Sequence, residues 1–213
     1  MSFADYTSLQ SEIGDYLARG DLTDKIPSFI RLCEAKLNRI LTCKDMEQRS
    51  TATIDIASDE PEFLSLPTDF QAMRRIRLSS IASKPRLEFA TQAFIDDKRT
   101  SGGNVIGQPR WFTVMGSELE LFPTPDAAYV LEMIYRKQIP ALADNDTNWL
   151  LETHPDAYLY GALLEAEPYM KNDARIGTWS QALASVVDQI NTNSQIAAFN
   201  AGPLSIQLRT QTP

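Results

Sequence analysis

The chain of 213 residues carries 28 Asp and Glu side chains against 20 Lys and Arg, so its formal net charge is −8. An acidic chain is a poor candidate for a protein that grips nucleic-acid backbones, because non-specific affinity for phosphates comes from Lys and Arg. The hydrophobic content of 43% is ordinary for a globular protein and argues against wholesale disorder.

Residues 1–47 are expected to fold as a helical hairpin. Over residues 3–19, apolar side chains recur at three- and four-residue steps and form the stripe of an amphipathic helix. After a short break a second helix of the same period is expected, with Thr23 or Asp24 as its N-cap. The two helices predict one part of a helical bundle.

The next segment, residues 48–140, is expected to form a compact antiparallel β-module, either a small sandwich or a barrel. Its clearest hairpin joins residues 111–114 to 118–122 through a turn at Gly116-Ser117. A helical turn and then a mobile glycine-containing loop are expected between residues 91 and 107. Further short strands are expected from β-branched or alternating residues at 51–56, 63–67, 72–78, 87–89 and 129–136.

Helical periodicity returns after Pro140. Residues 148–151 form a short expected helix and residues 173–199 a long one. Between them, residues 155–170 are apolar almost all round, which predicts burial on more than one side. Such burial fits the centre of the chain's own bundle and the surface of a neighbouring subunit equally well. Pro168 is expected to end or kink this helix.

These segments together predict an α+β fold. The N- and C-terminal segments, residues 1–47 and 141–199, form a helical bundle domain, and the small antiparallel β-module is inserted between them. Residues 200–213 follow the last helix as an extended C-terminal arm.

The arm alternates apolar with polar side chains as a strand does, but no neighbouring strand in the sequence is available to pair with it. It is either a frayed tail or a segment that adds to the sheet edge or groove of a partner. The alternation favours the second interpretation. The candidate interface residues are Leu204, Ile206, Leu208 and Arg209.

Charge is unevenly distributed along the chain. Residues 141–213 carry three basic and eight acidic side chains, whereas residues 48–140 carry eleven and twelve. Within the β-module, a basic cluster is interpreted first as a solvated sheet face, second as a salt-bridge contact with another subunit or protein, and third as a patch facing DNA. The cluster comprises the candidate contact residues Arg74, Arg75 and Arg77, together with Lys84 and Arg86.

No catalytic, cofactor-binding or metal-binding residues are predicted. The sequence has no glycine-rich loop ending in Gly-Lys-Ser/Thr and no His and Cys cluster at metal-ligand spacing. The single histidine, His154, precedes Pro155 at an expected helix start and is interpreted as a helix-entry residue. Cys33 and Cys43 would lie about 15 Å apart on one helix, too far for a disulfide, which indicates a reducing compartment. Neither a secretory signal nor an apolar run long enough to span a membrane is recognisable.

Paired carboxylates give little support to a glycosidase. Glu165 and Glu167 lie two positions apart on an expected helix, where their side chains diverge by about 200°. Asp96 and Asp97 stand beside Lys98 and Arg99 in what reads as a solvated surface turn. Two carboxylates from distant positions remain possible in a chain with this many acidic residues.

Three stretches in a fixed order resemble the head-tail adaptor (connector) proteins of tailed bacteriophages, in particular those of short-tailed bacteriophages. The first covers residues 21–39 and leads into 45–47. The second is LPTDF at 66–70, followed by residues 75–78. The third begins with NWLL at 148–151 and continues through HPDAYLYGAL at 154–163 to residues 167–169.

The resemblance, which covers about residues 5–195, implies a structural virion protein located at the head-tail junction and made in the host cytoplasm. Such adaptors form a ring, commonly twelve-fold, that docks under the portal protein and extends the DNA channel. The ring offers an attachment platform to tail nozzle or tail-fibre proteins, and DNA passes through its lumen without sequence-specific binding. The family's C-terminal segments often reach the portal or adjacent subunits, which agrees with the arm. No cofactor and no membrane are implied.

Two other functions stay open at this point. One is a virion-associated cell-wall hydrolase, and the other is a binding domain that never enters a virion. An acidic ring makes physical sense for a DNA conduit, because each cationic contact with phosphate would retain the DNA. We therefore expect acidic residues of the C-terminal third to line or rim the lumen.

Overall fold

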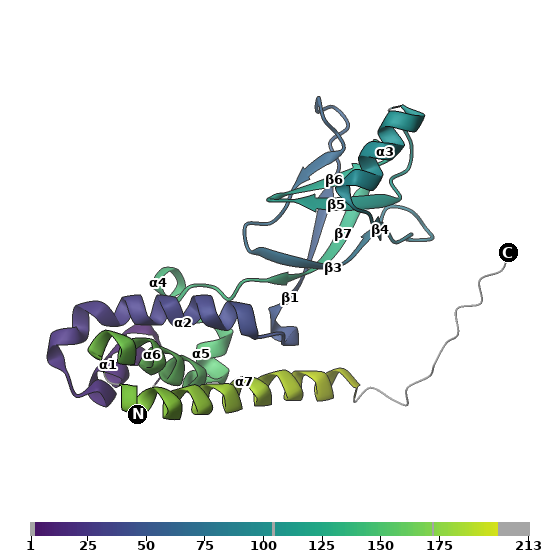
Figure 1. Ribbon diagram of the computed structural model, residues 1–213. Coiled ribbons are helices and arrows are strands. Elements are labelled where there is room, and N and C mark those ends of the chain that lie inside the picture. Colours follow the sequence, from purple (N-terminus) through teal and green to yellow (C-terminus); the bar gives the residue numbers. More distant parts are fainter. Residues whose placement is uncertain (1–2, 104, 172, 200–213) are drawn as a thin grey trace. The chain divides into compact units, whose positions relative to one another are not determined.

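The computed structural model describes residues 3–103, 105–171 and 173–199, and the chain divides into two compact units (Figure 1). The first, here called the helical unit, comprises the residues up to Asp45 and the chain from Ile139 onward. The second, the β-module, comprises Met46–Gln138. Helices make up the first unit and two small sheets dominate the second, so the fold class is α+β as expected.

In the helical unit, the N-terminal pair of helices forms as expected, but the second helix begins differently. Thr23 and Asp24 do not cap it, because a 3₁₀ helix at Gly20–Lys25 runs directly into it. The Ile26 N–H already bonds to the Leu22 carbonyl, so the preceding turn satisfies backbone groups that a side-chain cap would otherwise serve. The helices of the unit are α1 (Tyr6–Leu17), α2 (Ile26–Ile40), α4 (Leu142–Asn145), α5 (Trp149–Thr153), α6 (Pro155–Met170) and α7 (Ile176–Phe199).

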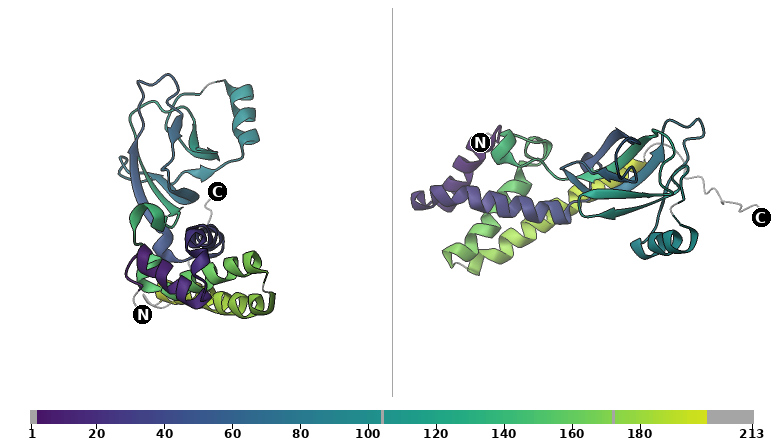
Figure 2. Two further views of the ribbon diagram at one scale, coloured as in Figure 1. Left: turned by 90° about the vertical axis from the view of Figure 1, so that its left-hand side faces the viewer. Right: turned by 90° about the horizontal axis from the view of Figure 1, so that it is seen from above.

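The central helix of this unit is α6, which contacts α1, α2, α5 and α7. Figure 1 shows it between α2 and α7, and in the view from above in Figure 2 α2 and α7 cross at an angle. Its apolar circumference is therefore covered by helices of its own chain, which explains the lack of a polar face. The helix continues two residues beyond Pro168 and ends where Lys171 adopts a left-handed conformation. Its buried residues are Ala157, Tyr158, Leu159, Gly161, Ala162, Leu163, Ala166 and Glu167.

The β-module contains two sheets. The three-stranded sheet is antiparallel, in the order β1 (Glu47–Thr53), β7 (Val130–Lys137) and β3 (Phe70–Leu78). The four-stranded sheet has the order β2 (Phe63–Ser65), β6 (Glu118–Phe122), β5 (Trp111–Met115) and β4 (Glu88–Phe89).

One edge of the second sheet departs from the antiparallel pairing that the module otherwise shows, as expected. Strand β4 pairs with β5 in parallel. A parallel pair needs a crossover connection rather than a tight turn, and α3 (Gln92–Gly102) supplies it. The same helix takes up Asp96, Asp97 and Ser101, which were expected in a turn and a mobile loop.

The two sheets share one apolar core. Leu131, Met133 and Tyr135 of β7 face it, as the alternation in this strand predicted. Ile76 of β3 and Leu119 of β6 enter it from the two different sheets. Of the two arrangements expected from the sequence, a sandwich and a barrel, the structure shows a sandwich-like packing of two small sheets.

The first strand of the module is shorter than expected at its C-terminal end. Strand β1 stops at Thr53, and Ile54 is buried, but Asp55 and Ile56 lie in an exposed loop. The Asp55 Oδ1 atom accepts a hydrogen bond of 2.9 Å from the Ala57 N–H. Such a local side-chain bond competes with the ladder of a strand and accounts for the early turn.

Candidate interaction surfaces

An arginine cluster surrounds one carboxylate on the outer face of the three-stranded sheet. Glu132 lies between the core residues Leu131 and Met133 of β7, so its side chain points to the opposite face. Its Oε2 accepts from Arg49 of β1 at 2.8 Å, and its Oε1 pairs with Arg77 of β3 at 2.6 Å. The strand order brings these residues together, because β7 is the central strand of the sheet.

The electrostatics of this cluster favour the ionised carboxylate. The Glu132 side chain is only 4% exposed, and bonds from Arg77 and then Arg49 lower its pKa to about 2. Arg75 lies 3.7 Å from the same carboxylate, at longer range than the other two arginines. Three guanidinium groups thus face one carboxylate, and the cluster carries an excess of positive charge.

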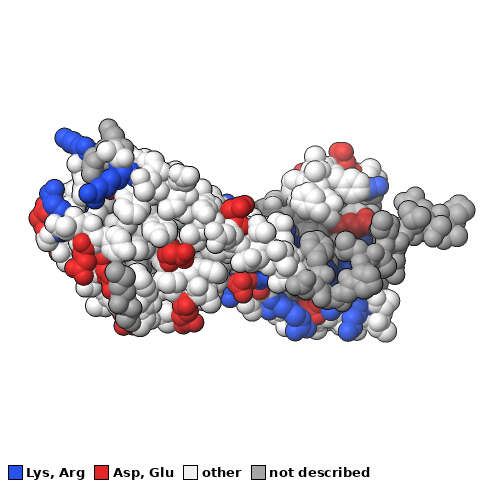
Figure 3. All heavy atoms as spheres, turned by 90° about the horizontal axis from the view of Figure 1, so that it is seen from below, with Lys and Arg blue, Asp and Glu red and all other residues white. Residues whose placement is uncertain are grey.

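The predicted contact residues Arg74, Arg75 and Arg77 are not equivalent. Arg77 is engaged within the module by Glu132, and Arg74 is about half exposed, 3.8 Å from Glu47. Figure 3 shows lysine and arginine side chains gathered on the side of the β-module that it displays. The intramolecular pairs were missed from the sequence, because Arg49 and Glu132 are 83 positions apart. Their role in contacts with other chains remains a prediction.

Beside the cluster lies a groove of about 550 Å³ that no sequence pattern indicated. It runs along the first part of β3 toward β4 and β5, which makes it a feature of the β-module alone. Its apolar lining includes Met73, Leu87 and Phe112, and Arg74, Arg75 and Arg86 also contribute to its wall. Phe89 stands at the groove with 66% of its surface exposed and makes an edge contact with Phe112 at 5.8 Å.

Helix α3 is attached to the four-stranded sheet by a second ion-pair group. Arg99 lies 2.8 Å from Glu120 of β6 and 3.7 Å from Glu62. Glu120 is 1% exposed, so Arg99 neutralises a buried carboxylate. The aromatic contact of Phe94 with Trp111, at 5.7 Å, holds the other face of the helix.

The two glutamates and the histidine that the sequence analysis weighed as catalytic candidates have structural roles in the helical unit. Glu165 pairs with Lys36 of α2, whereas Glu167 accepts a 2.9 Å hydrogen bond from the Trp179 indole of α7. The two carboxylates therefore point to different helices, as their spacing predicted. His154 occupies the N-cap position of α6. Within residues 3–103, 105–171 and 173–199, no group of three or more potential ligands suits a metal ion.

The two cysteines are buried and form no disulfide. Cys33 lies in α2, whereas Cys43 follows the end of that helix and is not part of it. Burial raises the pKa of the Cys33 thiol, so this group stays protonated at neutral pH. Among the described helices, none is long and apolar enough to cross a membrane.

Several residues of the family-like stretches have structural roles. Asn148 caps α5 by accepting from the Leu151 N–H at 2.9 Å, and its amide donates to the Tyr158 hydroxyl at 2.8 Å. In the β-module, the Tyr135 hydroxyl donates to Asp69 at 2.8 Å. The arm candidates Leu204, Ile206, Leu208 and Arg209 lie outside the described residues.

Comparison with known families accounts for almost the entire chain. A family model described as SU10 adaptor protein matches residues 4–207. The chain belongs to this adaptor family. The match confirms the resemblance to phage head-tail adaptors, and it extends past the expected limit near residue 195 into the first part of the arm. No curated protein matches the chain.

Membership identifies the protein as a phage adaptor of a structural family. An adaptor interacts with other head and tail proteins and is a component of the virion.

Proposed function

We propose that this adaptor is a non-enzymatic virion protein that forms a ring under the portal at the head-tail junction. The ring extends the DNA channel and offers an attachment platform to tail nozzle or tail-fibre proteins, with twelve copies as the expected number. The family match over residues 4–207 carries the proposal. The two compact units, one helical and one β-rich, supply each protomer with the distinct faces that a head-to-tail ring requires.

Contacts within the helical unit reduce the set of acidic residues that are candidates for lining the lumen. Glu165 and Glu167 are engaged inside the bundle by Lys36 and Trp179, so they are poor candidates for a surface that meets DNA. We propose that the lumen is lined from the remaining described acidic residues of the C-terminal third whose side chains reach the surface, namely Asp144, Asp146, Glu152, Asp156 and Asp188.

The decisive experiment combines composition with imaging. Mass spectrometry of purified particles is expected to detect this chain, and a cryo-EM map of the portal–tail junction is expected to show it as a ring. Absence from particles would leave the non-virion binding domain as the better function. A lumen lined mainly by Arg and Lys would contradict the acidic lining while leaving the ring intact. Cell-wall lysis by the purified chain, abolished by one Asp or Glu substitution, would contradict the non-enzymatic assignment.

The C-terminal arm provides a second test. We predict that deleting residues 200–213 leaves the protomer folded but weakens its attachment to isolated portal rings, because an alternating segment gains its binding energy on a partner. Circular dichroism checks the fold and co-sedimentation with portal rings checks attachment. Unchanged co-sedimentation of the truncated chain would show that the arm is not used.

A further inference from the structure

An acidic loop projects from the β-module. The segment between β1 and β2, residues 54–62, carries Asp55, Asp59 and Glu60, all exposed, and its apolar Ile56 is 50% exposed. Among the described residues, no cation lies within ion-pairing distance of Asp59 or Glu60. The loop therefore presents an apolar side chain together with unneutralised carboxylates, a combination suited to a partner with the opposite properties.

Those opposite properties occur at the groove beside β3. Two of its arginines form only long ion pairs within the module. Arg74 lies 3.8 Å from the Glu47 carboxylate, and Arg75 lies 3.7 Å from the Glu132 carboxylate. No described carboxylate lies within ion-pairing distance of Arg86. Phe89 adds a large exposed apolar surface. Arginine and exposed aromatic side chains around an apolar pocket are typical of the energetically important centre of a protein interface.

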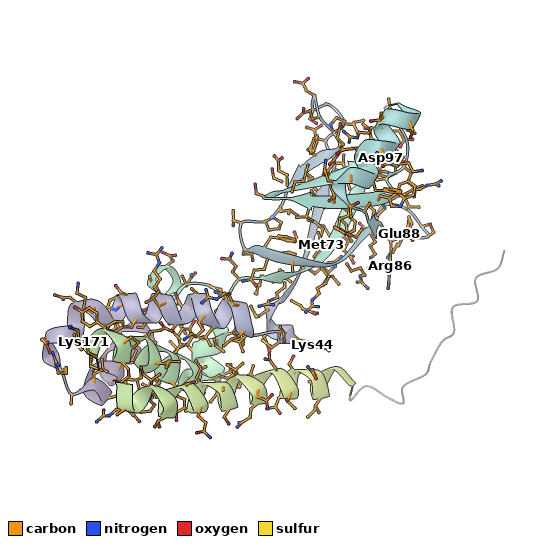
Figure 4. All side chains as sticks on the ribbon, in the orientation of Figure 1. Lys44, Met73, Arg86, Glu88, Asp97 and Lys171 are labelled. Atoms are coloured by element: carbon orange, nitrogen blue, oxygen red, sulfur yellow. The ribbon has the colours of Figure 1, made fainter. Side chains whose placement is uncertain are left out.

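The loop and the groove lie at different ends of the same module. In Figure 1 the segment joining β1 to β2 rises above the sheets, whereas the labelled groove residues Met73 and Arg86 of Figure 4 lie at the lower edge of the module. A loop anchored in this way does not reach its own groove. A second copy of the chain offers the complementary groove.

We propose that the 54–62 loop of one protomer docks in the Arg74–Arg86–Phe89 groove of the next protomer. The contact joins two different surfaces, so it propagates from copy to copy in the head-to-tail manner that closes a ring. Ile56 contacts Phe89 and the apolar lining, while Asp59 and Glu60 pair with Arg74 and Arg86. This inference names the contact between subunits of the proposed ring and to that extent rests on the proposed function.

The contact also explains why charge segregates within a nearly neutral module. Residues 48–140 carry eleven basic and twelve acidic side chains, and the groove and the loop concentrate the opposite signs. Complementary charge steers two copies into one register and disfavours loop-to-loop or groove-to-groove encounters.

A reciprocal charge reversal tests the pairing in the full chain. The loop variant carries Asp59→Lys and Glu60→Lys, and the groove variant carries Arg74→Glu and Arg86→Glu. Assembly on isolated portal rings is expected to fall about a hundredfold or more for either variant alone, because like charges then meet at every contact. An equimolar mixture is expected to recover assembly, since every contact between the two variants is complementary. A mixture that assembles no better than its components overturns the proposal.

A matched control separates this contact from a general effect of charge. Asp96→Lys with Asp97→Lys makes the same change in charge at two exposed positions of α3 that belong neither to the loop nor to the lining of the groove. This control is expected to assemble as the unmodified chain does. Equal loss in the control and in the loop variant would mean that net charge, and not the pairing, governs assembly, and would overturn the proposal.

A cross-link decides the question without the portal and so distinguishes failure of the contact from failure of the proposed function. Full chains carrying Ile56→Cys and Phe89→Cys are mixed at high concentration and oxidised, with the native Cys33 and Cys43 buried. A disulfide between the two variants, absent when Asp97→Cys replaces Phe89→Cys, is expected. Disulfides between identical variants alone would overturn the contact, whatever the portal experiment shows. Failure of the unmodified chain to join the portal, with the mixed disulfide present, would contradict only the proposed function.

Discussion

At the scale of single residues, Glu132 shows how one carboxylate holds three strands together. It sits on the central strand of its sheet and binds arginines from both neighbouring strands. Because its pKa in the folded state, about 2, lies below the ordinary value of 4.5, the folded state favours the ionised form. The stabilisation is fully present above pH 4.5 and is lost as the pH falls through about 2.

We predict that Glu132→Gln lowers the unfolding midpoint of the β-module at pH 7, because Arg49 and Arg77 lose their charged partner. The difference from the unmodified chain is expected to shrink as the pH falls from 4.5 toward 2, where Glu132 itself becomes neutral. Denaturant unfolding of both chains at a series of pH values measures this difference in the unfolding midpoint. A difference that does not change across this range would show that the ion pairs contribute no pH-dependent stability.

At Gly161, the backbone of α6 passes close to Cys33 of α2. A Cβ atom at this position would lie 2.2 Å from the Cys33 Sγ, which no pair of non-bonded atoms tolerates. We predict that Gly161→Ala destabilises the helical unit by about 1–3 kcal/mol through overpacking. Helix unfolding followed by circular dichroism at 222 nm measures the change.

The control for this prediction is the same substitution in a Cys33→Ala background. Removing the sulfur leaves the nearest Cys33 atom, its Cβ, at 3.5 Å, an ordinary contact. In that background Gly161→Ala is expected to cost nothing, because alanine is intrinsically better than glycine in a helix by about 1 kcal/mol. An unchanged cost would place the strain elsewhere.

At the scale of elements, α3 is the one α-helix in the described part of the β-module, and its attachment depends on Arg99. We predict that Arg99→Ala lowers the unfolding free energy of the module by about 3 kcal/mol, because it leaves the buried Glu120 carboxylate without its cation. Hydrogen exchange over residues 92–102 is expected to accelerate. Asp97→Ala, an exposed change on the same helix, is the control and is expected to stay within about 0.5 kcal/mol.

Element boundaries also show what local patterns can establish. The stripes of α1, α2 and α7 and the alternation of β7 were visible in the sequence, because each depends on residues within a single segment. The 3₁₀ helix before α2 and the early end of β1 at Thr53 were not visible. The 3₁₀ helix depends on the hydrogen bond from the Ile26 N–H to the Leu22 carbonyl, and the early end of β1 depends on the hydrogen bond that Asp55 accepts from the Ala57 N–H. Each of these bonds competes with the regular pattern.

At the scale of the whole molecule, we predict that the isolated chain is monomeric and forms its ring when the portal provides a template. Segments that order on binding, such as the expected arm, contribute their contacts only on the partner. Size-exclusion chromatography with light scattering, in the presence and absence of portal rings, measures the oligomeric state. A stable ring without the portal would remove the need for a template.

The sequence by itself determined the class of the molecule and its kinship. Periodicity gave helices, then strands, then helices, and the ordered stretches from residue 21 to residue 169 led to the adaptor family that the match over residues 4–207 establishes. These conclusions were accessible because helix and strand periods are properties of contiguous residues, and family stretches are read along the chain.

Only the tertiary structure decided which distant residues meet. Arg49 reaches Glu132 because β1 pairs with β7, Gly161 is required because α6 crosses Cys33, and β4 runs parallel to β5 because α3 provides the crossover. The groove with Phe89 and Arg86, and the acidic loop at the other end of the module, arise in the same way. Long-range pairing is fixed by the burial gained when segments meet, and the sequence pattern of one segment does not specify its partner.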